Sequence, residues 1–173
     1  DNWATFWRFI TSGTADPTGR PLTLLTFLLD ARDWPADPHR FKLTNLLLHL
    51  LNSGLLYALL TKLGQILAVE VHRSQTAAFV GTALWLLHPL LVSTTLYIVQ
   101  REAMLPATCI LAGLLTWLHG RGQLANRKIA GGLIWSVTGL GGFTLLGTLA
   151  KANGVLLPLF VLLIEIILLV PRQ

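Results

Sequence analysis

The sequence predicts an all-α membrane protein with about five transmembrane helices, one of them broken at a His-Pro pair. Hydrophobic residues make up 53% of the 173 residues, only 12% are charged, and the mean hydropathy is +0.63. Soluble domains carry about 25% charged residues. Several apolar stretches also approach the ~20 residues that cross a hydrocarbon core of about 30 Å. Short polar segments with turn residues separate these stretches, as expected of loops.

The candidate spans are residues 41–60, 76–99, 103–118, 129–150 and 155–170. The second of them contains His88-Pro89. Proline removes a backbone donor and clashes with the preceding turn, so a helix that enters it ends or kinks. We therefore expect either a broken span, or a span that ends at this pair and continues as a short interfacial or re-entrant piece.

Residues 1–40 are predicted to be a separate interfacial segment of one or two helices, placed before a transmembrane domain of residues 41–173. They hold four arginines and five aspartates, with three tryptophans among them. Tryptophan favours the membrane surface, where one part of its ring system is apolar and another is wet. The single apolar run, residues 21–29, is too short to span. A poorly ordered tail is the alternative, given the proline, glycine and aspartate content.

The basic residues predict the orientation of the spans. One side would carry Lys62, Arg73, Arg121, Arg127, Lys128 and Arg172. The other would carry Arg101 and Lys151. The positive-inside rule places the first group in the cytoplasm, so residues 1–40 lie outside and the C-terminus lies inside. No signal peptide pattern precedes that outer segment, and we expect the chain to be part of a longer protein or to be inserted by another factor.

Several function classes are not expected. The formal charge is +5, but the basic residues are spread singly and the only adjacent pair is Arg127-Lys128, whereas nucleic-acid binding needs clustered cations. The lone Cys109 permits no internal disulfide and no metal pair. No Ser-His-Asp order, zinc-ligand spacing or nucleotide-binding glycine loop is present. We therefore predict no nucleic acid partner and no metal.

A polar stripe marks the first span, because Asn45, His49 and Asn52 recur at helical spacing on one face. Polar groups at membrane depth are costly unless paired, which makes them functional candidates. The alternative is that they hydrogen-bond a neighbouring helix. His49 or His88 could also bind a haem or pigment metal, although no supporting carboxylate lies near either in the sequence.

Three cations are expected near one another on the outer face: Arg20, Arg101 and Lys151. Together they could bind a lipid-linked phosphate, which arginine holds bidentately. Alternatively, each anchors independently at the lipid headgroups. The carboxylates available for acid–base chemistry on that face are in residues 1–40 and at Glu102. Glu165, within the last span, either pairs across helices or faces the cytoplasmic interface.

Four blocks in order carry a family resemblance: SGTADPTGRPLTLLTFLL, WPADPHRFKLTNLLLHLLNSGLLY, ALWLLHPLLVSTTLYIVQREAML and LAKANGVLLPLFVLLIE. They resemble the membrane portion of bacterial GT-C type glycosyltransferase-like proteins with tetratricopeptide repeats, relatives of the transmembrane and tetratricopeptide-repeat O-mannosyltransferases. The likeness runs from about Trp7 to Glu165. It implies an integral enzyme of the bacterial inner membrane that transfers a sugar from a polyprenyl-phosphate donor to a protein on the outer face.

The resemblance also implies residue roles. Arg20, Arg101 and Lys151 would bind the donor phosphate. The cavity would be lined by Asn45, His49, His88, Gln100 and Asn153.

Three departures from the family pattern lead us to expect an incomplete or inactive enzyme. The acidic pair of the family precedes the GRPL block, which leaves Asp1 as the remaining candidate catalytic residue. Ala152 stands where the family has glutamate. The later spans and the repeats are missing.

Two other functions stay open: a non-catalytic structural or lipid-binding subunit of a larger complex, and a pigment- or haem-binding subunit. The expected small molecules are a polyprenyl-phosphate lipid or a bound phospholipid. The expected partners are membrane lipids and either partner subunits or the remainder of a longer chain. A transferase needs a carboxylate within reach of Arg101 and Lys151, whereas a scaffold needs an apolar face buried against other chains.

Overall fold

The computed structural model describes residues 2–13, 19–31 and 35–169, and every regular element in those ranges is helical. Two short helices, α1 (Asn2–Ile10) and α2 (Pro21–Asp30), precede the long helix α3 (Pro38–Ile66). The chain continues through α4 (Val71–Leu86), α5 (Leu91–Leu96), the 3-10 turn η1 (Ile98–Gln100) and the long helix α6 (Arg101–Ala125). The next helical stretch joins α7 (Ile129–Val137), η2 (Thr138–Gly142) and α8 (Phe143–Ala150). The last joins η3 (Ala152–Leu156), α9 (Leu157–Ile164) and η4 (Glu165–Leu169).

Four helical stretches of the described residues are long and apolar enough to cross a membrane: Pro38–Ile66, Ile98–Ala125, Ile129–Ala150 and Ala152–Leu169. The helix α4 has 16 residues, which is about 24 Å at 1.5 Å per residue and falls short of a bilayer core of about 30 Å. The chain is therefore all-helical with four candidate spans, and the expected number of about five is not confirmed.

The window of residues 76–99 is divided where the sequence places His88-Pro89. Helix α4 ends at Leu86, and its last turn closes with a bond from Leu87 N to Ala83 O. Proline then prevents the helix from continuing, because it has no N–H to donate. The short helix α5 and the turn η1 follow, and they lead directly into α6. The helix therefore ends at the pair, as the second alternative expects, but α4 is shorter than the span that this alternative requires.

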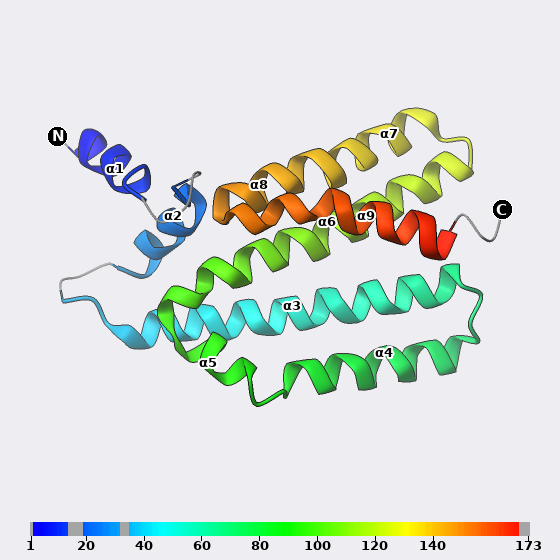
Figure 1. The fold of residues 1–173 in the computed structure, drawn as a ribbon, viewed down its shortest axis with the longest axis horizontal. Coiled ribbons are helices and arrows are strands. Elements are labelled where there is room, and N and C mark those ends of the chain that lie inside the picture. The colour runs from blue at the N-terminus through cyan, green and yellow to red at the C-terminus, as the bar shows by residue number, and fades with distance from the viewer. Residues whose placement is uncertain (1, 14–18, 32–34, 170–173) are drawn as a thin grey trace.

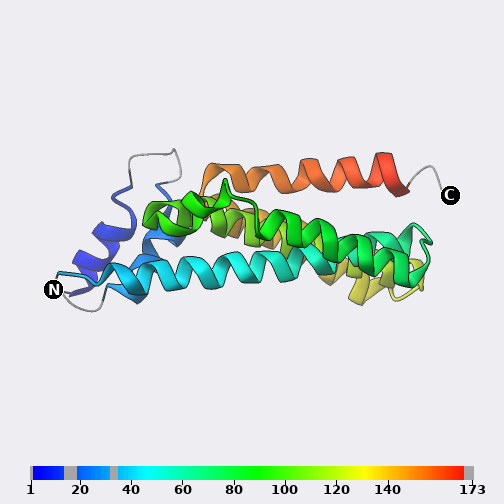
Figure 2. The ribbon, with the colours of Figure 1, turned by 90° about the horizontal axis from the view of Figure 1, so that it is seen from below.

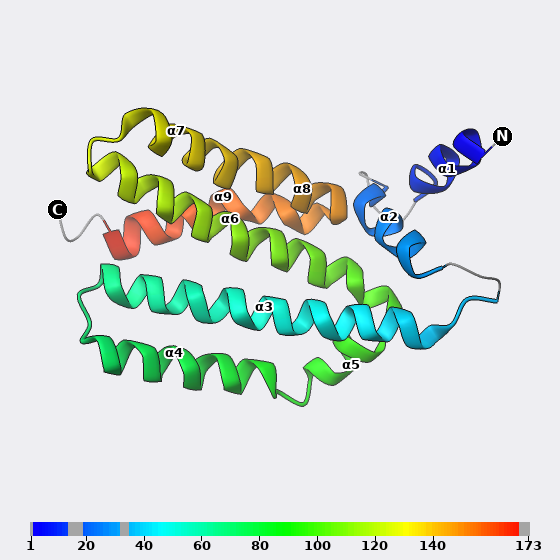
Figure 3. The same cartoon turned by 180° about the vertical axis from the view of Figure 1, so that it is seen from behind.

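The long helices lie side by side, with α6 at the centre (Figures 1 and 3). Helix α6 contacts α3 on one side and α7 and α8 on the other, while α4 packs against α3. Figure 2 shows α9 and η4 as a separate layer over one face, where α9 contacts α6. A buried apolar cluster joins these layers and comprises Leu59, Leu114, Trp117, Leu118, Leu157 and Leu169.

Glycine pairs set the spacing between α6 and its neighbour. A Cβ atom on Gly120 would lie 2.8 Å from the carbonyl oxygen of Gly132, and one on Gly139 would lie 2.9 Å from that of Gly113. Real Cβ atoms are almost never closer than 3.0 Å to another heavy atom. Small residues allow two helix backbones to touch in this way, so α6 and the α7–η2 stretch are held at backbone contact.

The bundle has two ends with different contents (Figure 1). One end, called the Arg101 end below, contains α1, α2, α5, the start of α6 and the junction between α8 and η3. The other end, called the Lys62 end, contains the turn between α3 and α4 and the turn between α6 and α7. The predicted grouping of the first forty residues with Lys151 agrees with this arrangement for the described residues, whereas the His-Pro turn lies further along α3, where Leu86 O is 3.1 Å from His49 Nε2. Their side of a membrane stays a prediction.

Candidate functional site

Arg101, the first residue of α6, is fully buried at 0% exposure and bonded to two other helices, α2 and α3. Its Nε donates to Asn45 Oδ1 at 3.0 Å, and its Nη1 donates to Thr26 O at 2.9 Å. Its Nη2 donates to Phe41 O at 3.1 Å and to the carboxylate of Asp30. A guanidinium has five N–H donors, and four of these bonds are made. Arg101 therefore ties α6 to both α2 and α3.

Aromatic rings complete the enclosure of Arg101. Its Cζ atom lies 4.9 Å from the ring centroid of Phe27 and 5.7 Å from that of Phe41, within the range of cation–π contacts. Asp30 also accepts a bond from Thr44 Oγ1 at 2.9 Å. A buried charge is tolerated when it is paired and its remaining donors are satisfied. Arg101 as placed here is thus a structural residue, and its expected role at a donor phosphate stays a prediction that requires these acceptors to exchange.

Glu102, the next residue, brings the other two predicted cations together. Its carboxylate accepts bonds from Arg20 Nη1 and, at 3.0 Å, from Lys151 Nζ. These partners lie 82 and 49 residues away in the sequence. The three side chains, called the Glu102 cluster below, are 17–24% exposed. The structure therefore joins Arg20 to Lys151 through a carboxylate.

An unusual backbone conformation positions Arg20. Both Gly19 and Arg20 have positive φ angles, of 70° and 56°. Glycine adopts this left-handed conformation readily, whereas a non-glycine residue does so at a cost of order 1 kcal/mol. Pro21 then starts α2 at a position where proline is favoured. Glu102, the partner of Arg20, lies in the first turn of α6, where the helix dipole favours a carboxylate.

A tight junction between α8 and η3 positions Lys151. Lys151 is extended, with φ −165° and ψ 150°, at the point where the chain reverses. A Cβ atom on Gly154 would lie 2.0 Å from the carbonyl carbon of Gly147, so only glycine fits there. The hydroxyl of Thr23 donates to Ala150 O at 2.8 Å and holds α2 against this junction. Arg20, which precedes α2, and Lys151, at the junction, therefore lie close together where α2 packs against the junction.

The paired cations at this end differ in how far a ligand could reach them. Arg20 and Lys151 of the Glu102 cluster are 18% and 24% exposed, whereas Arg101 is 0% exposed. An anion could therefore reach the Glu102 cluster, whereas Arg101 is enclosed.

The asparagines of the polar stripe on α3 hydrogen-bond neighbouring helical segments. Asn45 Nδ2 donates to Tyr97 O at 3.0 Å, while its oxygen accepts from Arg101. Asn52 Nδ2 donates to Met104 O at 3.1 Å, and its Oδ1 accepts from Thr108 Oγ1 at 2.7 Å. Both amides are buried with their donors and acceptors engaged. They join α3 to α6 and to Tyr97, just before η1, as expected if the polar stripe hydrogen-bonds neighbouring helices.

The two histidines lie near the end of α4 and differ in their surroundings. His49 is buried, its Nε2 lies 3.1 Å from Leu86 O, and its ring lies 4.9 Å from that of Trp85. His88 is exposed, and its Nδ1 accepts from Leu90 N at 3.3 Å. Over residues 2–13, 19–31 and 35–169, no group of three or more His, Cys, Asp or Glu could hold a metal ion. Haem or pigment binding stays an untested prediction.

The remaining predicted site residues are Gln100, Asn153 and Asp1. Gln100 is half-buried in η1 and Asn153 is exposed in η3. Asp1, the candidate catalytic residue, lies outside the described residues. Sequence reasoning missed Asp30 as the partner of Arg101, because it did not distinguish the aspartates of residues 1–40. It named Glu102 only as an available carboxylate.

Comparisons with protein-family models, with curated proteins and with solved structures found no match to this chain. The family resemblance therefore stays a prediction that rests on the four sequence blocks. In the described residues, every regular element is helical and four helices are long and apolar enough to cross a membrane. One end of the bundle carries a buried arginine centre and a carboxylate held between two cations.

Proposed function

We propose that this chain is the membrane portion of a GT-C type glycosyltransferase-like protein, and that a polyprenyl-phosphate sugar donor binds at the Glu102 cluster. One observation carries the proposal: Arg20 and Lys151 converge on a single carboxylate at one end of the bundle. Phosphate and carboxylate oxygens accept the same charge-assisted bonds from arginine and lysine. A site that holds the carboxylate of Glu102 in this way has donors suited to a phosphate.

The charge and exposure of the cluster support this assignment. Arg20 and Lys151 are 18% and 24% exposed, whereas Arg101 is 0% exposed. A donor phosphate that took the two cations would release Glu102 beside the bound sugar. Sugar transfer breaks the bond between the anomeric carbon and the phosphate oxygen, and forms one to an acceptor hydroxyl oxygen. The hydroxyl proton then needs a base, and the released carboxylate of Glu102 is the group we assign to it.

In this proposal Arg101 is a positioning residue. Its bonds to α2 and α3 fix the start of α6, and Glu102 is the next residue. The leaving polyprenyl phosphate carries negative charge, and fixed cations that face developing charge stabilise a transition state. Arg20 and Lys151 would provide that stabilisation, while Arg101 keeps their partner in place.

A second function, a non-catalytic structural or lipid-binding subunit, is favoured by a different observation. Four bonds of Arg101 end on protein acceptors, and Arg20 and Lys151 are already paired with Glu102. In this alternative the Glu102 cluster only ties α2, α6 and the α8–η3 junction together. The exposed apolar surface would then contact lipids or partner subunits.

The first experiment measures binding of a short-chain polyprenyl phosphate to the protein in lipid nanodiscs, with the matching polyprenol as the comparison. Arg20→Gln and Lys151→Gln should each weaken binding of the phosphate about tenfold, as expected for loss of a charge-assisted bond. Arg8→Gln is the control, because Arg8 is an exposed arginine of α1 in the same part of the chain. Equal binding of phosphate and polyprenol, or equal affinities for the three variants, would exclude a phosphate site at the cluster.

A second measurement separates the two functions. Radiolabelled sugar on polyprenyl phosphate is supplied with membrane protein acceptors, and transfer of label is followed for the unaltered chain and for Glu102→Gln. Transfer that Glu102→Gln abolishes supports the enzyme. Donor binding without transfer by either protein supports the lipid-binding subunit.

We further propose that the chain resides in the bacterial inner membrane with its Arg101 end outside and its C-terminus in the cytoplasm. The basic residues of the Lys62 end support this orientation. Pro35→Cys and Val69→Cys place exposed thiols at opposite ends, and the native Cys109 is buried. A membrane-impermeant maleimide should label Pro35→Cys in intact cells and should label Val69→Cys only after lysis. The reverse pattern would overturn the orientation.

A further inference from the structure

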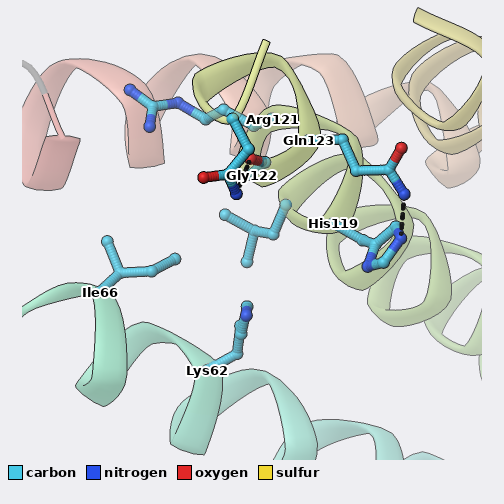
Figure 4. Close-up of a pocket in the computed structure, with 8 residues that line it drawn as sticks. Lys62, Ile66, His119, Arg121, Gly122 and Gln123 are labelled. Carbon is cyan, nitrogen blue, oxygen red and sulfur yellow. Dashed lines mark hydrogen bonds between the residues drawn. The ribbon is translucent and has the colours of Figure 1, made fainter. Parts of the chain in front are cut away.

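A cavity of about 270 Å³ lies at the Lys62 end, between the last turns of α3 and α6 (Figure 4). Its lining combines cationic and apolar side chains, among them Lys62 and Ile66 from α3 and Leu118 and Arg121 from α6. No residue of the Glu102 cluster takes part in it. The cavity is therefore a second feature with its own chemistry.

Lys62 is the available charge in this cavity. Its side chain extends from α3 towards the space below α6 (Figure 4). Across the parts of the chain that the structure describes, Lys62 makes no hydrogen bond and no ion pair. Arg121, by contrast, donates twice to Glu165, at 2.9 and 2.8 Å. Lys62 is thus the lining cation that a new ligand can engage without breaking an existing bond.

Helix capping does not account for Lys62. Lysines near a helix C-terminus often bond the last free carbonyls. In α3, however, Leu63 O accepts from Leu67 N, and Gly64 O accepts from Val69 N. In α6, Gly122 O likewise accepts from the backbone N–H of Asn126. Backbone donors already satisfy these carbonyls, so the charge of Lys62 remains for another partner.

The remaining lining suits an amphiphile. Leu118 is 2% exposed and forms an apolar floor together with Ile66. The side chain of Gln123 bonds His119 at 2.8 Å on the rim, and the guanidinium of Arg121 extends in the opposite direction (Figure 4). An anionic group could bind Lys62 at the rim while the carbon atoms attached to it cover the floor. A small inorganic anion would leave that floor uncovered.

The charge of the whole Lys62 end favours an anion. In the described part of the chain this end carries five cations, Lys62, Arg73, Arg121, Arg127 and Lys128, against two carboxylates, Glu70 and Glu165. An excess of three positive charges raises the local concentration of anions. At a membrane surface the abundant anions are phospholipid headgroups, which attract basic segments.

We propose that the cavity at the Lys62 end binds the phosphate headgroup of an anionic phospholipid, with Lys62 as the phosphate ligand. The headgroup lies at the rim, and the glycerol and first chain carbons lie over Ile66 and Leu118. This site is independent of donor binding at the Glu102 cluster, because the two lie at opposite ends of α6.

Native mass spectrometry of the full chain in detergent tests the proposal, with phosphatidylglycerol and phosphatidylcholine of identical acyl chains as probes. Phosphatidylglycerol should bind more tightly than phosphatidylcholine. Lys62→Gln should weaken the binding of phosphatidylglycerol about fivefold, which is the effect of one lysine at an anionic surface. Lys62→Arg keeps the charge and should retain this binding. Lys42→Gln is the matched control, because Lys42 is an exposed lysine at the opposite end of the same helix.

Several outcomes would overturn the site. Equal binding of the two lipids, or equal losses for Lys62→Gln and Lys42→Gln, would show nonspecific adhesion. Competition by glycerol phosphate or inorganic phosphate at the same concentration as the lipid would identify a site for soluble anions. Circular dichroism of each variant checks the helical fold, and failure of this test leaves the polyprenyl phosphate result at the Glu102 cluster unchanged.

Discussion

The two ends of the bundle use charge in different ways. At the Arg101 end, the paired charged side chains are buried or half-buried and join segments that are far apart in the sequence, as Arg101 does with Asp30. At the Lys62 end, most cations are exposed, and the described residues form an ion pair there between Arg121 and Glu165. The helices of that end are held instead by backbone contact, as at Gly120 and Gly132. Arg101 is therefore structural because protein acceptors surround it, whereas Lys62 has no such acceptor among the described residues.

The largest expected effect on the free energy of unfolding comes from removing the Arg101 side chain. Arg101→Ala removes the partner of Asp30 and Asn45 and leaves their polar groups buried. Breaking a buried charge pair by removing one partner costs about 3–5 kcal/mol. We expect the free energy of unfolding, measured by denaturant titration in micelles, to fall by that amount. Arg8→Ala, at an exposed position, should change it by less than about 0.5 kcal/mol. Similar values for the two variants would mean that Arg101 does not hold the Arg101 end together.

The second prediction tests backbone contact at the Lys62 end. In Gly120→Ala the new Cβ atom would lie 2.6 Å from Ser136 N and 2.8 Å from Gly132 O, so the two helix backbones must separate. Overpacking of this kind costs about 1–3 kcal/mol, less the roughly 1 kcal/mol that alanine gains over glycine in a helix. Gly122→Ala is the matched control in the same helix, because nothing lies within 4 Å of its Cβ position. Equal unfolding free energies for the two variants would contradict the close contact.

Much of this comparison could be predicted from the sequence. Apolar length located the four long helices with end positions that differ by up to seven residues from the structure, because crossing a bilayer requires about 20 apolar residues whatever the tertiary packing. The spacing of Asn45, His49 and Asn52 indicated one polar face. The order of the spans placed Arg20 and Lys151 at the same end. These features follow from periodicity and connectivity, which are local properties of the chain.

Other features required the three-dimensional packing. The partner of Arg101 is Asp30, 71 residues earlier, and it reaches Arg101 only because α2 docks against α3, α6 and α8. The window of residues 76–99 contains no Asp, Glu, Lys or Arg, so hydropathy alone did not decide between one span and two helices. Helix α4 also begins earlier than the apolar window, at Val71, and includes His72 and Arg73. Glycine contacts and the bond acceptors of a buried arginine leave no periodic signal.

The third prediction concerns the Glu102 cluster, where pairing is intermediate between the two ends. Lys151 and Glu102 are 24% and 17% exposed, so solvent screens their attraction in part. A double-mutant cycle with Lys151→Gln and Glu102→Gln should give a coupling of about 1 kcal/mol in the free energy of unfolding, reduced at high salt. A coupling as large as the effect of Arg101→Ala would assign the cluster a mainly structural role and weaken the case for an exchangeable donor site.

The smallest effect is expected at the Arg121–Glu165 pair. Its geometry is bidentate, with bonds of 2.9 and 2.8 Å, but the side chains are 29% and 34% exposed. Exposed pairs contribute about 0.2–1 kcal/mol because water and salt screen them. Glu165→Gln should therefore lower the free energy of unfolding by less than about 1 kcal/mol, and added salt should remove most of the difference. It should also release Arg121 beside the cavity at the Lys62 end, so that phosphatidylglycerol binds more tightly there. Loss of phosphatidylglycerol binding in this variant would mean that Glu165 shapes the cavity and does not merely compete for its cation.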